Sequence, residues 1–238
     1  MFENVEILAK DSIFIFVETT VDITTQTDDM SFLYTDQIKF DSGGNEQNVE
    51  LVTLVQDAIF LFPELDSEGM VGTISLGLDE EGNPILVEGF ILEQDQLKFT
   101  NEKPYVIYGY AAVPSGETLV VNAGARVHFH ENSGIIVAEN ASMQCNGAPS
   151  SDPVLLENEI IFEGDRLEPS FADIPGQWAT IWLTAGSTNH SFTNTTIKNA
   201  IAGILMDSND GDLTLSLNDV QIYNSSNVGL LARNGNVY

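Results

Sequence analysis

Short apolar runs separated by turn residues recur through the second half of the chain. Residues 134–137, 203–206 and 229–232 each begin with Gly and continue with three apolar residues. Strands this short do not bury their apolar faces alone, so units of this length must stack on one another. The pattern predicts a solenoid of the parallel β-helix kind over residues 105–238.

A repeated phrase sets the expected stacking register. Ile-Lys-Asn, ending at Asn199, returns 25 residues later as Ile-Tyr-Asn, ending at Asn224. We expect Ile197 to stack against Ile222 with both side chains inside, and the two Asn residues to lie at turns, where Asn tolerates left-handed backbone angles and can pair its amide with that of the next coil. A ligand role for the Asn residues is the alternative. The predicted structural ladder consists of Asn199, Asn224, Gly203 and Gly229.

The first half of the chain has a different texture. Residues 11–21 and 49–55 are rich in β-branched and aromatic residues with partial alternation, and a turn cluster occupies residues 41–47. These features predict strands of an antiparallel sheet. We place a boundary near Asp57, and residues 58–104 are expected to form a β-rich connector and the start of the solenoid. Because sustained helical periodicity is nearly missing, the predicted fold class is all-β.

Several phrases resemble a known family. KPYVIYGY, IIFEGDRLEP, DIPGQWATIWL and the repeats above are similar to the right-handed parallel β-helix surface proteins and lipoproteins of Bacteroidota. KDSIFIFVETTVD and the sequence that follows it to residue 57 resemble the last strands of the immunoglobulin-like domain that precedes the helix in that family. The resemblance implies a pectate-lyase-like right-handed solenoid over 105–238, preceded over 1–57 by a partial immunoglobulin-like β-sandwich.

The same resemblance carries expectations about location and activity. It implies cell-surface or outer-membrane placement of the full-length parent, and it implies no established enzymatic activity. Compared with the family pattern, the chain opens inside the sandwich without a signal or lipobox Cys and stops within the solenoid, so it is expected to be a fragment. An uncovered last coil exposes unpaired strand edges, which predicts self-association near residues 213–238.

The amino-acid composition excludes some classes of binding partner. The chain has 36 acidic and 8 basic residues and a net charge of −28, which disfavours nucleic acid and anionic membrane surfaces by repulsion. No apolar run approaches the roughly 20 residues that cross a bilayer. Cys145 stands alone, so no disulfide forms within the chain. The expected partners are a polysaccharide or another surface protein.

The densest polar cluster lies in a predicted loop. Glu163, Asp165, Arg166, Glu168 and Asp173 fall within about ten residues. Paired carboxylates are what glycoside hydrolysis requires, one as acid and one as base or nucleophile. The competing interpretation is structural, with Asp165 and Arg166 forming a charge-assisted pair that fixes the loop. We favour the structural interpretation and treat the cluster as a candidate binding loop.

Two groups of residues are candidate metal ligands. Asp207, Asp210 and Asp212 offer oxygen ligands suited to Ca²⁺, but the distal Glu of a calcium loop is missing, which favours a solvated turn. His128 and His130 alternate on one predicted strand and so face the same side, although no third zinc ligand is evident. The expected cofactor is therefore none, with calcium as the open alternative.

The aromatic residues admit two interpretations. Trp178, Trp182, Tyr105 and Tyr108 form either a sugar-stacking platform on a flank of the solenoid or packing between coils. Taken together, the sequence predicts a non-catalytic surface protein for adhesion or glycan contact. The alternative is a polysaccharide lyase or glycoside hydrolase on the same scaffold.

Overall fold

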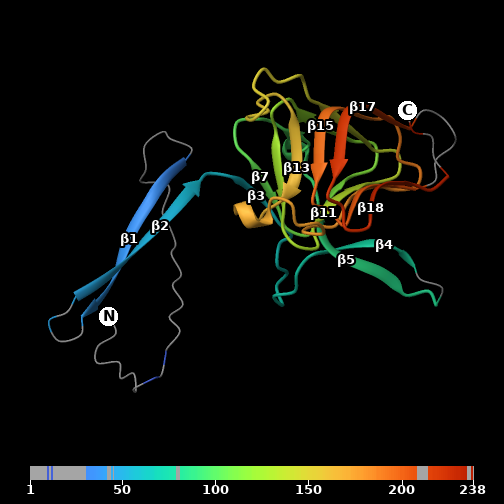
Figure 1. The fold of residues 1–238 in the computed structure, drawn as a ribbon. Helices are drawn as coiled ribbons and strands as arrows, with labels where there is room; N and C mark the ends of the chain where they lie inside the picture. The colour runs from blue at the N-terminus through green and yellow to red at the C-terminus, as the bar shows by residue number, and fades with distance from the viewer. Residues whose placement is uncertain are drawn as a thin grey trace. The chain divides into compact units, whose positions relative to one another are not determined.

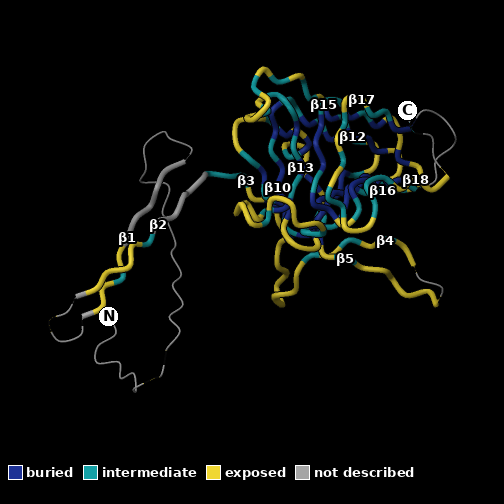
Figure 2. Tube along the Cα trace, in the orientation of Figure 1, coloured by how far each residue is buried: buried dark blue, intermediate teal, exposed yellow. Residues whose placement is uncertain are grey.

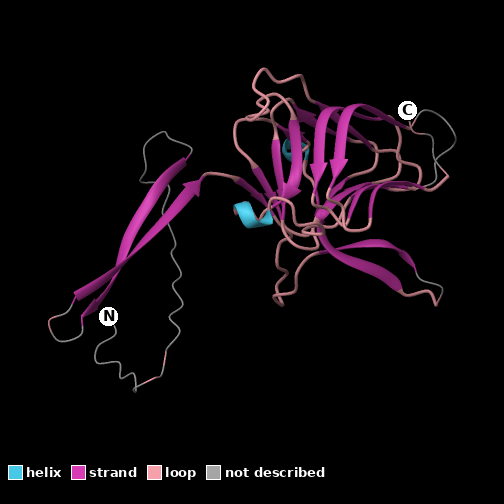
Figure 3. Ribbon diagram, viewed as in Figure 1, coloured by secondary structure: helices cyan, strands magenta, loops and turns pink. Residues whose placement is uncertain are grey.

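The computed structural model describes residues 10, 12, 31–41, 44, 46–78, 81–207, 214–234 and 237. The chain divides into two compact units, Met1–Asp57 and Ala58–Tyr238. Figure 3 shows that strands dominate, and the described helical segments are two single 3₁₀ turns, η2 (Gln94–Gln96) and η3 (Pro169–Phe171). No helix in the described ranges is long and apolar enough to span a membrane. The prediction of an all-β chain is confirmed.

The described part of the first unit is a two-stranded antiparallel sheet. Strands β1 (Ser31–Asp41) and β2 (Glu46–Gln56) pair along their whole lengths. Gly44, in the connection between them, has a φ of 97°, a left-handed angle that Gly adopts without steric cost. The predicted strand over residues 11–21 lies outside the described residues, apart from Ser12.

Three stacks of parallel strands build the second unit (Figure 1). The first stack contains β3 (Ile59–Leu61), β7 (Tyr105–Ile107), β10 (Arg126–Phe129), β13 (Ile160–Gly164) and the C-terminal halves of β15 (His190–Lys198) and β17 (Leu215–Tyr223). The second stack contains β5 (Pro84–Ile91), β8 (Tyr110–Val113), β11 (Gly134–Val137), β14 (Ile181–Leu183), β16 (Ala202–Met206) and β18 (Val228–Ala232). The third stack contains β6 (Lys98–Phe99), β9 (Thr118–Asn122), β12 (Ser142–Asn146) and the N-terminal halves of β15 and β17.

The chain runs through the first, second and third stacks in turn and then returns to the first. We call one pass through the three stacks a coil. Every coil pairs with the coil before it in register, so that Ile197 of β15 lies opposite Ile222 of β17. Inward side chains of successive coils form one apolar core, the dark blue interior in Figure 2. Phe129 stacks on Trp178 with ring centroids 4.3 Å apart, and both residues are fully buried. Each such side chain contributes roughly 1.5–3 kcal/mol by leaving water.

Single residues with left-handed backbone angles turn the chain between stacks. Asn199 and Asn224 have φ values of 65° and 54° after the first stack. Asn194 and Asp219, with φ of 43° and 53°, bend β15 and β17 so that each strand belongs to two stacks. Asn and Asp reach these angles at lower cost than other residues with a Cβ.

One arginine anchors the segment between β12 and β13 to the stack. The Arg126 guanidinium donates hydrogen bonds to five backbone carbonyls at distances from 2.6 to 3.4 Å. Those carbonyls belong to Gly124, Ala125, Leu155, Leu156 and Glu159. The guanidinium therefore holds the loop by its main chain.

Residues 58–104, expected to form a β-rich connector and the start of the solenoid, contribute strands to all three stacks of the first coil. They also form a hairpin, in which β4 (Thr73–Leu78) pairs antiparallel with the first half of β5. The last residues of β5 pair with β8 instead, so the hairpin projects from the second stack (Figure 1).

Candidate functional site

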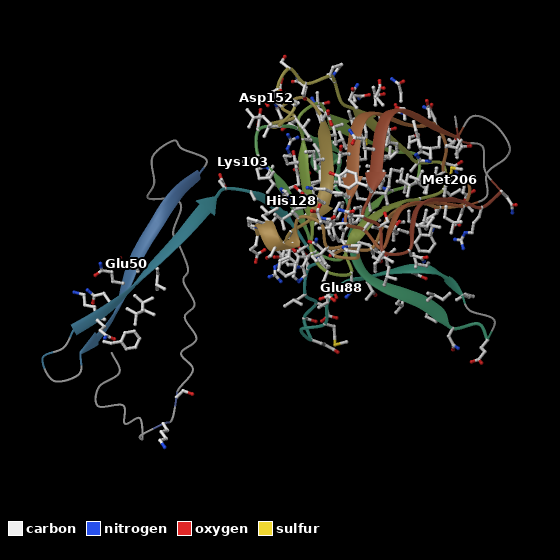
Figure 4. All side chains as sticks on the ribbon, in the orientation of Figure 1. Glu50, Glu88, Lys103, His128, Asp152 and Met206 are labelled. Atoms are coloured by element: carbon white, nitrogen blue, oxygen red, sulfur yellow. The ribbon has the colours of Figure 1, made fainter. Side chains whose placement is uncertain are left out.

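A row of titratable side chains crosses the outer face of the first stack. His128 lies opposite Glu163 in the pairing of β10 with β13, and Lys198 follows on β15. Lys198 Nζ lies 2.6 Å from Glu163 Oε2, and His128 Nδ1 lies 3.6 Å from Glu163 Oε1. The alternation of strand side chains places all three outside the core. Figure 4 labels His128 in this row.

Burial controls the charge of His128. The residue is 8 % exposed, and its Nδ1 has no hydrogen-bond partner. Burial lowers the pKa of His128, and this effect outweighs the opposing attraction of the Glu163 carboxylate. The imidazole is therefore neutral at pH 7, and the ion pair of the row is the one between Glu163 and Lys198.

His130, two residues after His128 on the same outer face, has a different partner. His130 Nδ1 lies 2.7 Å from Asp165 Oδ2, which leaves Nε2 available to a ligand. The His130 ring lies against the Tyr108 ring, with centroids 4.6 Å apart. His128 and His130, considered together above as zinc ligands, thus face separate carboxylates, Glu163 and Asp165.

A hollow of about 710 Å³ opens beside His130, between the first and second stacks. We call it the tyrosine hollow. Its side chains combine aromatic rings with hydrogen-bonding groups: Tyr108, Tyr110, His130, Glu88, Glu131 and Asn132. Figure 4 labels Glu88, which β5 contributes. Glu88, His130, Glu131 and Asn132 are exposed, so their polar groups are open to a ligand.

Two successive corners hold the tyrosine hollow in shape. Gly109 turns the chain between Tyr108 and Tyr110 with a φ of 67°, and Asn132 turns the next corner with a φ of 60°. Ser133, which is fully buried, accepts a hydrogen bond from the Gly109 N–H at 2.8 Å and so ties one corner to the other. This hydrogen bond joins the corner that carries Tyr108 and Tyr110 to the corner that carries Asn132.

The other residues of the predicted polar loop have several different partners. Arg166 forms a salt bridge of 2.9 Å with Glu168, and its guanidinium lies 3.9 Å from the centroid of Phe171. Asp165 bonds to His130, as described above, while Asp173 accepts a hydrogen bond from Asn224 at 3.3 Å. The five residues of the loop therefore make several separate contacts.

The ladder residues fix this loop as well. Asn199 Nδ2 donates to the carbonyl of Ala172 at 3.0 Å, and Asn224 donates to Asp173. We expected the amides of Asn199 and Asn224 to pair with each other between coils. Instead, each amide holds the segment between β13 and β14. In the second stack, a Cβ on Gly203 would come within 2.5 Å of the Gly229 carbonyl oxygen.

The calcium candidates are described only in part. Asp207 accepts a hydrogen bond from Trp182 Nε1 at 2.8 Å and from Arg233 Nε at 2.7 Å. Asp210 and Asp212 lie outside the described residues. Within the described ranges, no three or more His, Cys, Asp or Glu side chains converge in a way that could hold a metal ion.

The four aromatic candidates separate into two classes. Trp178 and Tyr105 are buried in the core, at 0 % and 5 % exposed. Trp182 and Tyr108 are half-buried and line surface hollows.

Sequence reasoning missed Tyr110, Glu88, Glu131 and Asn132. The Tyr-Gly-Tyr corner at 108–110 was the available signal, because a Gly between two tyrosines turns the chain where both rings lie near the surface. The acids and Asn132 carry no motif of their own.

Comparison of the chain with protein-family models, with curated proteins and with solved structures found no match.

Proposed function

We propose that the chain is a non-catalytic cell-surface protein that contacts a neutral glycan through the tyrosine hollow. Its second unit is a right-handed parallel β-helix of the pectate-lyase-like kind, and its first unit is the end of an immunoglobulin-like sandwich. The cyclic order of the three parallel stacks supports the helix, and the antiparallel pair β1–β2 is compatible with the sandwich. The lining of the tyrosine hollow is the observation that carries the function.

The lining suits a sugar for two reasons. Tyrosine rings are flat apolar surfaces with a polar tip, and the C–H faces of a pyranose stack on such rings. Carboxylates, an amide and an imidazole, as in Glu88, Glu131, Asn132 and His130, exchange hydrogen bonds with hydroxyl groups. The acids, together with a net charge of −28, repel uronic acids and sulfated sugars, so the ligand is uncharged.

An enzyme on the same scaffold, a lyase or glycoside hydrolase, is the alternative function. Glycoside hydrolysis requires two carboxyl groups free to exchange protons on either side of the scissile bond. Glu163 is held in an ion pair with Lys198, and Asp165 is held by His130. These contacts disfavour catalysis by the carboxylates of the loop.

Isothermal titration calorimetry with neutral xylo-, manno- and gluco-oligosaccharides tests the proposal. Tyr108→Ala should weaken binding about tenfold or more, because stacking on a ring and its exclusion of water are lost together. Tyr223→Ala is the matched control, because Tyr223 is 42 % exposed on β17 and does not line the tyrosine hollow.

The contrary outcomes are distinct. Equal loss in Tyr108→Ala and Tyr223→Ala would place the binding elsewhere, and failure of all neutral sugars to bind would refute the glycan. Release of reducing ends during incubation, abolished by Glu131→Gln, would replace the binding role with hydrolysis.

A further inference from the structure

Strand β4 has a free edge. It ends the sheet of the second stack and pairs with β5. Directly before β4, the Gly72 N–H donates to the Glu64 carbonyl at 3.0 Å, so the open part of the edge begins at Thr73. The Gly89 N–H donates to the Gly72 carbonyl at 3.0 Å, so in this antiparallel ladder Ile74 also points its backbone groups at β5. The N–H and C=O groups of Thr73 and Ser75, which alternate with it, face the open edge.

An apolar groove of about 620 Å³ adjoins this edge, between β4 and the outer face of the second stack. The lining is mainly apolar and includes Ile74, Leu76, Ala112, Ile136 and Trp182, together with the carboxyl groups of Glu139 and Asp207. Trp182 is half-buried, although its strand lies in the middle of the stack, so its ring is accessible from the groove.

A second hollow of about 600 Å³ adjoins the same edge and has a different character. Its polar lining includes the carboxylates of Glu64 and Glu93 and the amide of Gln96, and we call it the acidic groove. The two grooves share Ile74, Ser75 and Ile91. The open edge of β4 therefore runs where an apolar hollow and an acidic hollow meet.

We propose that β4 binds an extended segment of a partner protein as an added strand, and that this segment alternates apolar with basic side chains. An added strand satisfies the open N–H and C=O groups of Thr73 and Ser75, and its side chains point alternately to two sides. Apolar side chains enter the apolar groove, and Lys or Arg side chains enter the acidic groove. This interaction is separate from the glycan contact and does not depend on it.

The charge balance selects a cationic partner over a second copy of the chain. Only 8 of the 238 residues are basic and the net charge is −28, so two copies repel each other at an acidic edge. Neighbouring apolar residues are also open to solvent: Leu78 is 68 % exposed and Leu86 is 54 % exposed. An exposed apolar surface of this kind, next to a free edge, is typical of an interaction site.

The pairing of β4 with β5 also sets the length of the docked strand. The register of β4 shifts between Ser75 and Leu78, and Gly77 there has a φ of 114°. Such a bulge interrupts regular pairing. The regular edge is confined to the first residues of β4, so a segment of about seven residues, at roughly 3.3 Å each, spans it with overhang at both ends.

A blocked heptapeptide of alternating valine and lysine, acetylated and amidated, is the test ligand. Binding is measured by calorimetry and by tryptophan emission, since Trp178 is buried and Trp182 lines the apolar groove. We expect saturable binding that weakens as salt is raised. Trp182→Phe should remove the change in emission while calorimetry still detects binding.

Two further ligands separate strand addition from charge attraction. The same peptide with alternate amides N-methylated cannot form the ladder, and a peptide of alternating valine and glutamate reverses the charge. Both should bind at least about tenfold more weakly. If either binds as well as the first peptide, or if the first does not bind, the proposal is wrong.

Variants of one residue test the edge itself. Ser75→Pro deletes an N–H that faces the open edge and should reduce affinity about tenfold, whereas Ser75→Ala keeps the N–H and should bind within about twofold of the original chain. Equal melting temperatures establish that Ser75→Pro folds; if it does not fold, the N-methylated peptide decides. Dimerisation without peptide that Ser75→Pro abolishes would instead assign the edge to a second copy and overturn the proposal.

Discussion

His190 Nδ1 accepts a hydrogen bond from the backbone N–H of Met143, 47 residues earlier in the chain, at 3.1 Å. On the other side of the ring, His190 Nε2 lies 3.0 Å from Ser187 Oγ. Because Ser187 Oγ donates its proton to the Thr184 carbonyl at 2.7 Å, it must accept one from Nε2–H. The contacts therefore require a neutral imidazole, protonated on Nε2.

This arrangement predicts acid sensitivity. Burial lowers the pKa of His190 from 6.5 to about 4. Between those values the unfolded chain binds a proton that the folded chain does not, so the free energy of unfolding falls as pH decreases through this window. The full shift corresponds to about 3 kcal/mol lost by pH 4 and nothing lost above about pH 7. Urea unfolding at several pH values measures the slope.

His190→Gln provides the comparison for the acid effect. Its overall stability differs from that of the original chain. Between pH 6.5 and 4, however, its free energy of unfolding should fall less steeply with decreasing pH, by nearly the 1.4 kcal/mol per pH unit that roughly corresponds to one proton. Identical slopes for the two chains would show that His190 does not control acid sensitivity.

Two glycines in equivalent positions of successive coils should respond differently to alanine. A Cβ on Gly203 would come within 2.5 Å of both the Gly229 carbonyl oxygen and Ile222 Cγ2, whereas a Cβ on Gly229 would meet its nearest atom, Ile222 Cγ2, at 3.4 Å. Gly203→Ala should therefore cost about 1–3 kcal/mol by overpacking. Gly229→Ala should change stability by no more than about 0.5 kcal/mol. Denaturant unfolding of both variants checks this, and equal losses would contradict it.

The strands and their spacing were predictable from local pattern. Ile197 and Ile222 lie opposite each other because each precedes an Asn that turns the chain, and a repeat with such a turn residue specifies the register. Turn chemistry acts within a few residues, so a single sequence exposes it. Strand β2 was predictable for the same reason, because residues 49–55 alternate and follow the turn cluster at 41–47.

The candidate sites depend on contacts that local pattern does not specify. Glu88 and His130 both line the tyrosine hollow although they belong to the first and third coils, with Tyr108 and Tyr110 of the second coil between them, and neither carries a motif. Asp165 bonds to His130 and not to the adjacent Arg166, because strand alternation turns it toward the outer face of β10. Side-chain partners of this kind follow from register between coils, which sequence spacing alone leaves open.

Calcium should have little effect on stability. Asp207 already accepts hydrogen bonds from Arg233 and Trp182, so binding a cation there requires breaking them. We expect 1 mM Ca²⁺ to change the melting temperature by less than about 1 °C. Differential scanning fluorimetry with Ca²⁺ against EDTA measures this. A rise of several degrees that Asp210→Ala removes would reveal a calcium site at residues 207–212.

The last coil offers a second open edge. Within the described ranges, β18 pairs only with β16, and β17 pairs with β15 and, at Leu215 alone, with Val237. Ile222 and Leu230 remain half-buried. We expect the 238-residue chain to self-associate through this edge, and salt to strengthen association by screening the net charge. Light scattering at rising concentration and salt measures the association.

Hydrogen exchange locates this contact. At low concentration β18 should exchange faster than β11, and its protection should rise with concentration. A chain that stays monomeric at high concentration and high salt, with β18 as protected as β11, would exclude this interface.

The hydrogen bonds of Arg126 to the backbone determine which nearby positions can change as the sequence diverges. Its guanidinium contacts only carbonyl oxygens in the segment it holds, and every amino acid supplies the same carbonyl. Substitutions at Leu155, Leu156 and Glu159 therefore leave the anchoring bonds in place, whereas replacing Arg126 removes all of them. Relatives of this protein should vary freely along the segment while keeping the arginine, so that the loop changes its chemistry without losing its attachment.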